Sequence, residues 1–346
     1  MYSKLINWSL NEFSSLPWRK KRNLYTTLVS EIMLQQTTVS TVLNHYPVFI
    51  KKYPNIKSLS KISEEEICIA WKGLGYYRRA RNLLKAAKTI DELGSFPKEK
   101  SELIKIPGIG EYTASALISI GGDRPELAID ANIERVVSRL YGVKEQKGLK
   151  LQKKIRTELY PKIEKLFKTY SSRELNEALM DLGRVYCQAR KADCAICPMK
   201  SRCIAFKKGK PLDFPEKPKE KGSKKYYDLK LARFVVLHQG KVLGYVKNEQ
   251  SWLSGQVEIP TFIIKSEDSS LVQYPKVRKV IKEKANGKIK SSITKYRIEN
   301  HYWVVSKADF ERISGISKGY KYFKFDRQMG NFSTTTLKIL NKVIGD

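Results

Sequence analysis

The chain has 346 residues, enough for two or three domains with cores of their own, and no apolar run approaches the length of a membrane-spanning helix. Lys and Arg number 66 against 35 Asp and Glu, which gives a formal net charge of +31 at neutral pH. Such a charge indicates a polyanionic partner, most often nucleic acid, unless the whole proteome is rich in lysine. The first residues lack the apolar core of a signal peptide, so we expect a cytoplasmic protein that does not enter a membrane.

Residues 1–205 are predicted to be helices joined by short connections that contain Gly and Pro. Asp130 is a good N-cap for the helix that follows it, and Gly142 is well suited to end that helix. Apolar periodicity and capping signals predict helices at Leu24–Leu34, Ser101–Ile106, Glu111–Ile120, the stretch after Asp130, and Ser171–Tyr186.

The composition changes after residue 206. Residues 207–228 form a predicted basic linker, because residues 207–225 are rich in Lys and Pro with hardly any apolar content. Beyond it, β-branched and apolar runs predict strands, the first two of them joined as a hairpin around Gln239-Gly240. These runs are Leu231–His238, Lys241–Lys247, Val257–Lys265 and Tyr302–Val305.

Four of the five cysteines are clustered, at Cys187, Cys194, Cys197 and Cys203. A disulfide framework is a poor interpretation because nothing in the chain indicates secretion. Four neighbouring thiolates otherwise bind zinc or an iron–sulfur cluster. Zinc sites usually contain two C-x2-C pairs and this chain has one, so the spacing moderately favours a [4Fe–4S] cluster. The remaining Cys68 is expected to be a buried apolar residue.

The segment Ile106-Pro107-Gly108-Ile109-Gly110 between two predicted helices indicates a helix-hairpin-helix. Gly108 and Gly110 would let the backbone approach a phosphate closely, and the following helix start offers free N–H groups to the anion. Such contacts position DNA without reading its sequence. The alternative is an ordinary turn between two helices.

Two carboxylates are candidates for acid–base chemistry. Glu31 lies at the edge of an apolar helix face, and if it were buried its pKa would be raised enough to make it a proton donor. Asp130, at a helix N-terminus, is expected to stay ionised because N–H groups and the helix dipole favour its charge. A neutral acid paired with a charged carboxylate suits cleavage of a glycosidic bond. Taken alone, however, Glu31 is better explained as a surface residue and Asp130 as a simple helix cap.

Several motifs now occur together in one order. The chain resembles the endonuclease III superfamily of helix-hairpin-helix DNA glycosylases, and within it the adenine DNA glycosylase (MutY) family, strongly over residues 5–205 and weakly over 225–346. The resemblance rests on the hairpin and the four cysteines together with Leu16-Pro17-Trp18-Arg19, Ser30-Glu31-Ile32-Met33-Leu34-Gln35-Gln36-Thr37, Gly73-Leu74-Gly75-Tyr76-Tyr77 and Ile129-Asp130-Ala131-Asn132.

The resemblance implies roles for four catalytic residues. Glu31 matches the general acid that protonates the adenine leaving group, and Asp130 matches the carboxylate that stabilises the sugar cation. Tyr112 stands where lyases of the superfamily carry a lysine; because Tyr cannot form an imine, we expect a monofunctional glycosylase. Asn132 resembles the residue that orients the catalytic Asp or a water.

The resemblance also implies residues that bind the substrate, DNA and a cofactor. The cysteine spacing matches the family's [4Fe–4S] loop, here residues 187–203, and the loop's basic residues would face the phosphate backbone. The substrate-binding residues would be Trp18, Arg19, Gln35 and Glu177 at the adenine, and Gln36, Leu74 and Tyr76 as a wedge in the base stack; the loop residues facing DNA would be Arg190 and Lys191.

The C-terminal part, residues 229–346, resembles the Nudix-like domain that reads 8-oxoguanine opposite the adenine. Trp252–Pro260 is similar to its loop-and-strand signature, and since no clustered glutamates form a hydrolase box, we expect binding without hydrolysis. The segment Ile298–Trp303 departs from the family's Phe-Ser/Thr-His motif: Glu299 is unfavourable against DNA, and His301 is a weak candidate to replace the lost contact.

Together these patterns predict a mainly α N-terminal helix-hairpin-helix glycosylase domain (1–206, with the cluster loop 187–203), a basic linker (207–228) and an α+β Nudix-like domain (229–346). The predicted function is removal of adenine mispaired with 8-oxoguanine or guanine in double-stranded DNA by a monomer associated with the nucleoid. One alternative is a thymine/guanine mismatch glycosylase of the same superfamily. Another is a non-catalytic iron–sulfur protein that binds DNA.

Overall fold

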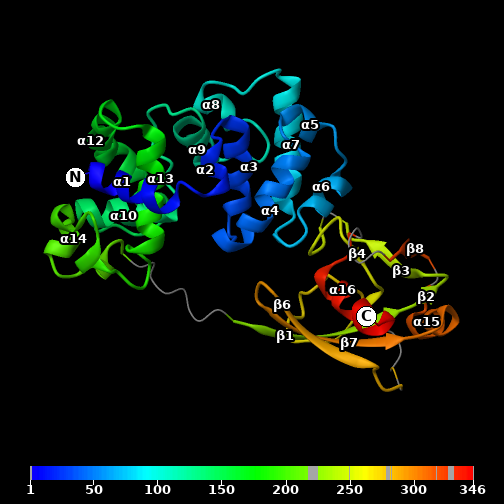
Figure 1. Cartoon of the computed structure of the whole chain (residues 1–346). Helices are drawn as coiled ribbons and strands as arrows, with labels where there is room; N and C mark the ends of the chain where they lie inside the picture. Colours follow the sequence, from blue (N-terminus) through cyan, green and yellow to red (C-terminus); the bar gives the residue numbers. More distant parts are fainter. Residues whose placement is uncertain are drawn as a thin grey trace. The chain divides into compact units, whose positions relative to one another are not determined.

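The computed structural model describes residues 2–216, 225–248, 250–277, 281, 283–316, 318–325 and 331–345, which form two compact units (Figure 1). The first unit holds the residues up to Glu64, Gly73–Gly75 and those from Arg79 to 216; the remaining described residues form the second. The first unit is helical and the second is built on β-sheets, which confirms the predicted fold class at this level. Among the described residues, no helix is long and apolar enough to cross a membrane.

Several of the helices that precede residue 208 begin at polar caps. Asn23 and Thr26 form a reciprocal capping box at the start of α3, and the Asp130 side chain caps α10, which ends at Gly142 in the left-handed conformation. The helices are α1 (Tyr2–Phe13), α2 (Pro17–Lys20), α3 (Leu24–Leu34), α4 (Val39–Lys52), α5 (Ile56–Ser60), α6 (Glu64–Ala70), α7 (Arg78–Glu92), α8 (Lys100–Leu103), α9 (Glu111–Ala116), α10 (Ala131–Tyr141), α11 (Leu149–Lys154), α12 (Tyr160–Glu164), α13 (Ser172–Val185) and α14 (Ile204–Lys207).

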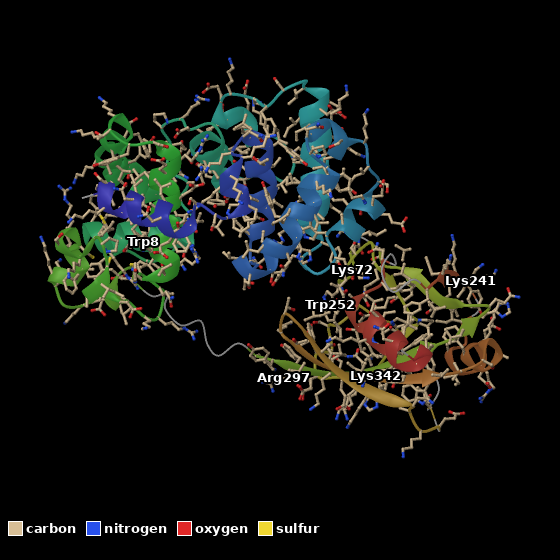
Figure 2. All side chains as sticks on the ribbon, viewed as in Figure 1. Trp8, Lys72, Lys241, Trp252, Arg297 and Lys342 are labelled. Carbon is tan, nitrogen blue, oxygen red and sulfur yellow. The ribbon has the colours of Figure 1, made fainter. Side chains whose placement is uncertain are left out.

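One apolar cluster of the first unit joins its earliest and latest helices. Leu5 of α1, Ile133 of α10 and Leu175 of α13 are all fully buried in it, and Trp8 of α1 packs on Tyr186 with ring centroids 5.1 Å apart (Figure 2). This packing holds α10 and α13, which carry several of the predicted site residues, on one rigid body.

The predicted helix Glu111–Ile120 is confirmed as helical but changes its type. The α-helix α9 ends at Ala116 and continues as the π-helix η1 (Leu117–Gly121), whose last carbonyls accept hydrogen bonds from the Arg173 side chain. Single π turns in helices often occur at functional sites. Here the wider turn includes Ile120, which lines the cleft described below.

The second unit contains two sheets. One sheet has the strand order β5-β1-β7-β6, in which β1 is parallel to β7; in the other, β3 pairs with β2, β4 and β8. The strands are β1 (Tyr227–Val235), β2 (Leu237–His238), β3 (Lys241–Val246), β4 (Val257–Glu258), β5 (Thr261–Ser266), β6 (Gly287–Ile293), β7 (Tyr296–Val304) and β8 (Lys321–Lys324), with helices α15 (Lys307–Ser314) and α16 (Thr334–Ile344).

The predicted strands of this unit are present with different ends. The run Val257–Lys265 is split into β4 and β5, and Pro260, which has no N–H for a sheet, lies in the gap. The segment Ile298–Trp303 lies inside β7, between β1 and β6, and is therefore regular strand; there, His301 Nε2 lies 2.6 Å from Glu299 Oε1. Lysines such as Lys241 and Lys342 are exposed on the unit's surface (Figure 2).

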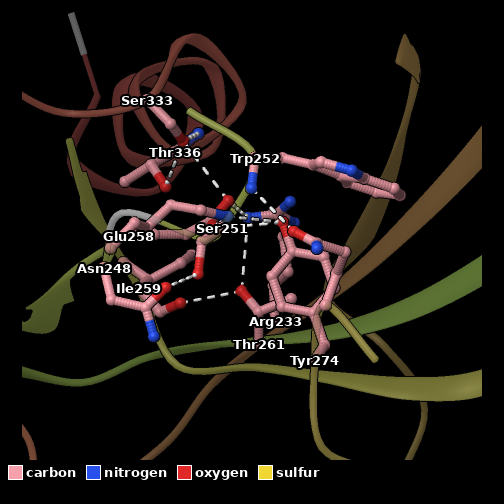
Figure 3. Close-up of polar contacts among 12 residues, drawn as sticks. Arg233, Asn248, Ser251, Trp252, Glu258, Ile259, Thr261, Tyr274, Ser333 and Thr336 are labelled. Atoms are coloured by element: carbon pink, nitrogen blue, oxygen red, sulfur yellow. Dashed lines mark hydrogen bonds and ion pairs between the residues drawn. The ribbon is translucent and has the colours of Figure 1, made fainter. Parts of the chain in front are cut away.

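A buried polar network connects the two sheets of the second unit (Figure 3). Glu258 of β4 is 1% exposed and accepts hydrogen bonds from Arg233 of β1 at 2.7 Å, from Lys247, and from Tyr274 at 3.1 Å. Arg233 also donates to Asn300 of β7 at 2.7 Å. We call these five residues the Glu258 network. Because β1, β4 and β7 all contribute to it, the network fixes how the sheets pack.

The predicted linker includes residues that belong to the first unit and residues that belong to the second unit. Phe214 is buried among the residues of the first unit, and its carbonyl accepts a hydrogen bond from Arg139 Nε at 2.9 Å. Strand β1 begins at Tyr227. Residues 217–224 of the predicted linker lie outside the described residues.

Candidate active site

A cleft with a volume of about 960 Å³ lies in the first unit. Residues from α2, α3, α9, α10 and α13 reach it although they are far apart in the sequence. The predicted site residues that line it are Trp18, Arg19, Glu31, Gln35, Gln36, Tyr112, Asp130, Asn132 and Glu177. The structure thus brings together all four predicted catalytic residues and most of the predicted substrate-binding residues in one cavity.

Glu31 is a buried acid at this cleft. It lies in the last turns of α3, is 8% exposed, and accepts a hydrogen bond from the Tyr112 hydroxyl of α9. Burial raises the pKa of Glu31 to about 7, while the Tyr112 hydrogen bond lowers it and the charges of Asp130 and Glu177 raise it further. At neutral pH a substantial fraction of Glu31 is therefore protonated and able to donate.

Asp130 is held by three donors of its own helix start. Its Oδ1 accepts from the Asn132 and Ile133 amides at 2.9 and 2.6 Å, and its Oδ2 accepts from Asn132 Nδ2 at 2.8 Å. Burial raises the pKa of the Asp130 carboxyl, and these hydrogen bonds act in the opposite direction. The donors leave the carboxylate little freedom to rotate, so its position in the cleft is fixed by α10.

Two arginines order the acidic wall of the cleft. Arg19 donates to Asp181 at 2.8 Å, and Arg22 makes a two-pronged contact with Glu177 at 3.1 and 2.8 Å. Arg22 and Asp181 were not predicted as site residues. Asp181 follows Glu177 by one helical turn on α13, so the spacing would have placed both on one face.

The predicted wedge residues lie on short segments with strained backbone. Gln36 follows the end of α3 with φ of 55°, and Tyr76 in the Gly-rich turn has φ of 48°. Leu74 is buried and Tyr76 is 62% exposed. Gln36 reaches the cleft, whereas Leu74 and Tyr76 are not among the residues that line it.

The two glycines of the hairpin do different things. Gly108 has φ of 87°, and a Cβ there would lie 2.7 Å from Asn82 Cβ, so packing against α7 requires glycine. Gly110 is extended at the start of α9, and a Cβ there would meet no atom within 4 Å. Open space in front of the first amides of α9 is what a close approach by a phosphate needs.

The four clustered cysteines surround one small cavity. Burial raises the pKa of the Cys194 thiol, and the nearby Cys203 and Cys187 thiols raise it further. Arg139 Nη1 lies 3.2 Å from Cys187 Sγ. In the described part of the chain, no three His, Cys, Asp or Glu side chains are grouped as one metal ion would require. The four cysteines therefore share one cavity.

Hydrogen bonds connect the cysteine loop to α10. Arg135 donates to the Cys187 carbonyl at 2.7 Å and to Asn132 Oδ1 at 2.8 Å, and Asn132 in turn binds Asp130. Arg190 and Lys191 are exposed on the loop. The loop thus rests on the helix that begins with the candidate carboxylate.

Comparison with known proteins identifies the family. The model of the HhH-GPD superfamily of base excision DNA repair proteins matches residues 29–163. The adenine DNA glycosylase of Buchnera aphidicola subsp. Acyrthosiphon pisum is 36% identical over 254 residues, which cover 72% of this chain and 71% of the relative. The chain belongs to the adenine DNA glycosylase family.

Two further similarities concern the N-terminal part above all. The adenine DNA glycosylase of Buchnera aphidicola subsp. Schizaphis graminum is 39% identical over 225 residues, 64% of each chain. The alignments thus span 64 to 71% of the length of these two curated relatives. The solved structure of a thermostable thymine-DNA glycosylase has a TM-score of 0.52 and 28% identity over 60% of this chain and 95% of the other. The first unit therefore has the helix-hairpin-helix glycosylase fold of the family.

Proposed function

We propose that this member of the adenine DNA glycosylase family removes adenine mispaired with 8-oxoguanine or guanine from double-stranded DNA. The observation that supports it most is the pairing, in one cleft, of Glu31 with a pKa of about 7 and Asp130 held by three N–H donors. One acid ready to give a proton and one carboxylate fixed beside it are what cleavage of an N-glycosidic bond requires.

In the proposed reaction Glu31 is the proton donor. The Tyr112 hydroxyl donates to Oε2, which leaves Oε1 of Glu31 to carry the proton that passes to the imidazole ring of the flipped adenine. The bond between C1′ and the base then breaks, and its electron pair leaves with the adenine. Because Tyr112 has no amine to form an imine, the sugar cation is captured by water and the strand is not cut.

Asp130 stabilises the sugar cation that forms. Asn132 holds one of its oxygens, and the amides of α10 hold the other, so the carboxylate does not reorganise when positive charge develops. Water then adds to C1′ and loses a proton, which leaves an abasic site. The adenine itself is bound by Trp18, Arg19, Gln35 and Glu177, and Gln36, Leu74 and Tyr76 fill the gap in the base stack.

The DNA backbone is held by Gly108 and Gly110 of the hairpin and by Arg190 and Lys191 of the cysteine loop. We further propose that the second unit is Nudix-like and recognises the base opposite the adenine. Glu299 and His301 lie in a regular strand. Any preference for adenine opposite 8-oxoguanine over adenine opposite guanine is measured in the experiment below.

We propose that the cysteine cavity holds a [4Fe–4S] cluster, because four thiols line it and their spacing resembles that of the family's cluster loop. Cys187, Cys194, Cys197 and Cys203 would bind the cluster, which would hold the loop together. Analysis of iron, sulfide and zinc in the purified protein tests this: about four irons and four sulfides per chain support it, and stoichiometric zinc contradicts it.

Single-turnover excision on four duplexes tests the proposed activity: adenine opposite 8-oxoguanine, adenine opposite guanine, thymine opposite guanine, and undamaged DNA. Wild type is compared with Glu31→Gln and with Glu12→Gln, an exposed acid on α1 that serves as the control. Alkali added afterwards cuts abasic sites. We expect adenine release by wild type and by the control, and its loss in Glu31→Gln.

The other outcomes separate the alternatives. Release of thymine opposite guanine would make the chain a mismatch thymine glycosylase, in line with its similarity to the thermostable thymine-DNA glycosylase. Duplex binding without any cleavage by metal-loaded protein would leave a DNA-binding role. Equal rates opposite guanine and 8-oxoguanine would retain the adenine chemistry but remove lesion recognition from the proposal.

A further inference from the structure

Arg79, the second residue of α7, is 8% exposed, and its side chain donates to six oxygens of the first unit. Nη1 donates to the carbonyls of Ile32 at 2.9 Å, Met33 at 2.8 Å and Gln35. Nη2 donates to Thr37 Oγ1 at 2.9 Å and to the carbonyls of Leu74 and Gly75 at 3.0 and 3.1 Å. One guanidinium therefore joins two segments that are about 40 residues apart in the sequence.

The first segment is the C-terminal end of α3. The last carbonyls of a helix have no partner in the helix itself, and a cation there also interacts favourably with the helix dipole. Arg79 takes the place of the missing helical donors for Ile32 and Met33 and then binds the chain as it leaves the helix at Gln35. It thereby fixes both the end of the helix that carries Glu31 and the start of the loop with Gln36.

The second segment is the Gly-rich turn. Gly73 and Gly75 have positive φ, and Tyr76 follows with φ of 48°. A backbone of this kind is strained at each non-Gly residue and persists only where surrounding contacts hold it. The Arg79 bonds to the carbonyls of Leu74 and Gly75 are such contacts, one and two residues before Tyr76.

We propose that Arg79 is a positioning residue for base flipping: it sets the separation of the two segments whose side chains fill the base stack once the adenine has left it. This inference rests on the proposed function. A wedge works only if its parts enter the stack together, and without Arg79 each part would depend on its own strained backbone. The role requires a planar group with several N–H donors, which lysine does not provide.

The test compares Arg79→Lys with wild type and with Arg81→Lys on the same helix, where the Arg81 side chain lies 3.6 Å from Glu64. The single-turnover rate is measured for adenine opposite 8-oxoguanine (the paired substrate) and for adenine opposite an abasic position (the gapped substrate). In the gapped substrate the adenine has no partner base, so little unstacking is needed. Since unstacking costs a few kcal/mol, we expect Arg79→Lys to slow the paired substrate more than about tenfold and the gapped substrate far less.

A second readout does not depend on catalysis. The same variants are made in the Glu31→Gln background and mixed with duplex that contains 2-aminopurine in place of adenine. We expect the fluorescence increase on binding to be smaller in Arg79→Lys than in Arg81→Lys. An equal increase in the two would overturn the inference, and this holds even if wild type proves to excise no adenine and the proposed function fails.

Folding is controlled with a milder variant. Thr37→Val removes one acceptor of Arg79 from the loop and leaves the guanidinium in place. We expect a smaller defect in the same direction, again larger for the paired than for the gapped substrate. Equal slowing of both substrates by Arg79→Lys and by Thr37→Val would mean that Arg79 only stabilises the fold.

Discussion

Glu31 of the first unit and Glu258 of the second are the same residue type at nearly the same burial, yet their pKa values move in opposite directions. Burial raises the pKa of Glu31 to about 7. Burial also opposes the charge of Glu258, but Arg233 and Lys247 outweigh it and hold the pKa of this carboxyl below its usual range. Glu31 accepts a hydrogen bond from a tyrosine hydroxyl, whereas Glu258 forms ion pairs with two cations.

The difference shows that burial sets the scale of a pKa shift while the neighbours decide its sign. Glu258 is a permanent anion that organises two sheets and exchanges no proton near neutral pH. In the part of the chain that the structure describes, Glu31 forms no ion pair with a cation, which weakens folding and creates a proton donor. In the sequence, each of the two is a glutamate with an apolar neighbour.

The largest expected effect is the loss of catalysis in Glu31→Gln. The amide keeps the shape and can still accept from Tyr112, but it has no proton to give. We expect the single-turnover rate of adenine excision to fall on the order of 10²–10⁴-fold. Glu258→Gln, assayed below its unfolding temperature on adenine opposite guanine, should stay near wild type. Similar losses of excision rate in Glu31→Gln and Glu258→Gln would contradict the different roles of the two glutamates.

For stability the order of the two variants is reversed. Glu258→Gln leaves Arg233 and Lys247 buried without an anion, and breaking a buried pair in this way costs about 3–5 kcal/mol. Chemical denaturation followed by fluorescence of Trp252 and Trp303, both in the second unit, would show it. A loss below about 1 kcal/mol would mean that water reaches the network.

Glu31→Gln should instead stabilise the protein, in a pH-dependent way. Glu31 has a folded pKa of about 7 and an ordinary value of 4.5, so the native state binds more protons between these values. Wild type therefore loses stability as pH rises through this window, by about 3 kcal/mol in all. Denaturation at pH 4.5 and pH 8 should show little gain for Glu31→Gln at the lower pH and most of it at the higher. A gain independent of pH would contradict the assignment.

The smallest effect concerns Tyr112. Excision should decline as pH rises through about 7, because Glu31 loses its proton. The hydrogen bond from Tyr112 lowers the pKa of Glu31, so Tyr112→Phe should move this decline to higher pH. Rates measured between pH 6 and pH 9 would locate the midpoint, and a midpoint moved to lower pH would be inconsistent with the hydrogen bond as described.

The parts of the molecule that sequence reasoning predicted follow local rules. Asp130 and Gly142 mark the ends of α10 because capping depends on a few neighbouring residues. Strand β6 (Gly287–Ile293) was not predicted from the sequence, because it is an edge strand with alternate residues exposed and few apolar side chains. Its pairing with β7 supplies what the local pattern lacks.

Within the candidate site, the residues that stand in sequence motifs could be predicted. The residues that hold them in place through long-range contacts could not. Glu31 and Asp130 stand in short recognisable segments. Arg22 and Arg79 act through contacts with residues far away in the sequence, which no local spacing reveals. The burial that raises the pKa of Glu31 is likewise a property of several packed helices.

Asp130 is both the cap of a central helix and the proposed stabiliser of the sugar cation. Most substitutions at this position would weaken both the helix start and the chemistry. The destabilised protein would then be degraded by the cell's proteases. Asn is the exception, since it caps as well as Asp and carries no charge. An Asp130→Asn protein would accumulate at normal levels and occupy lesions without repairing them. A cell would be harmed more by this one well-folded variant than by the many that are degraded.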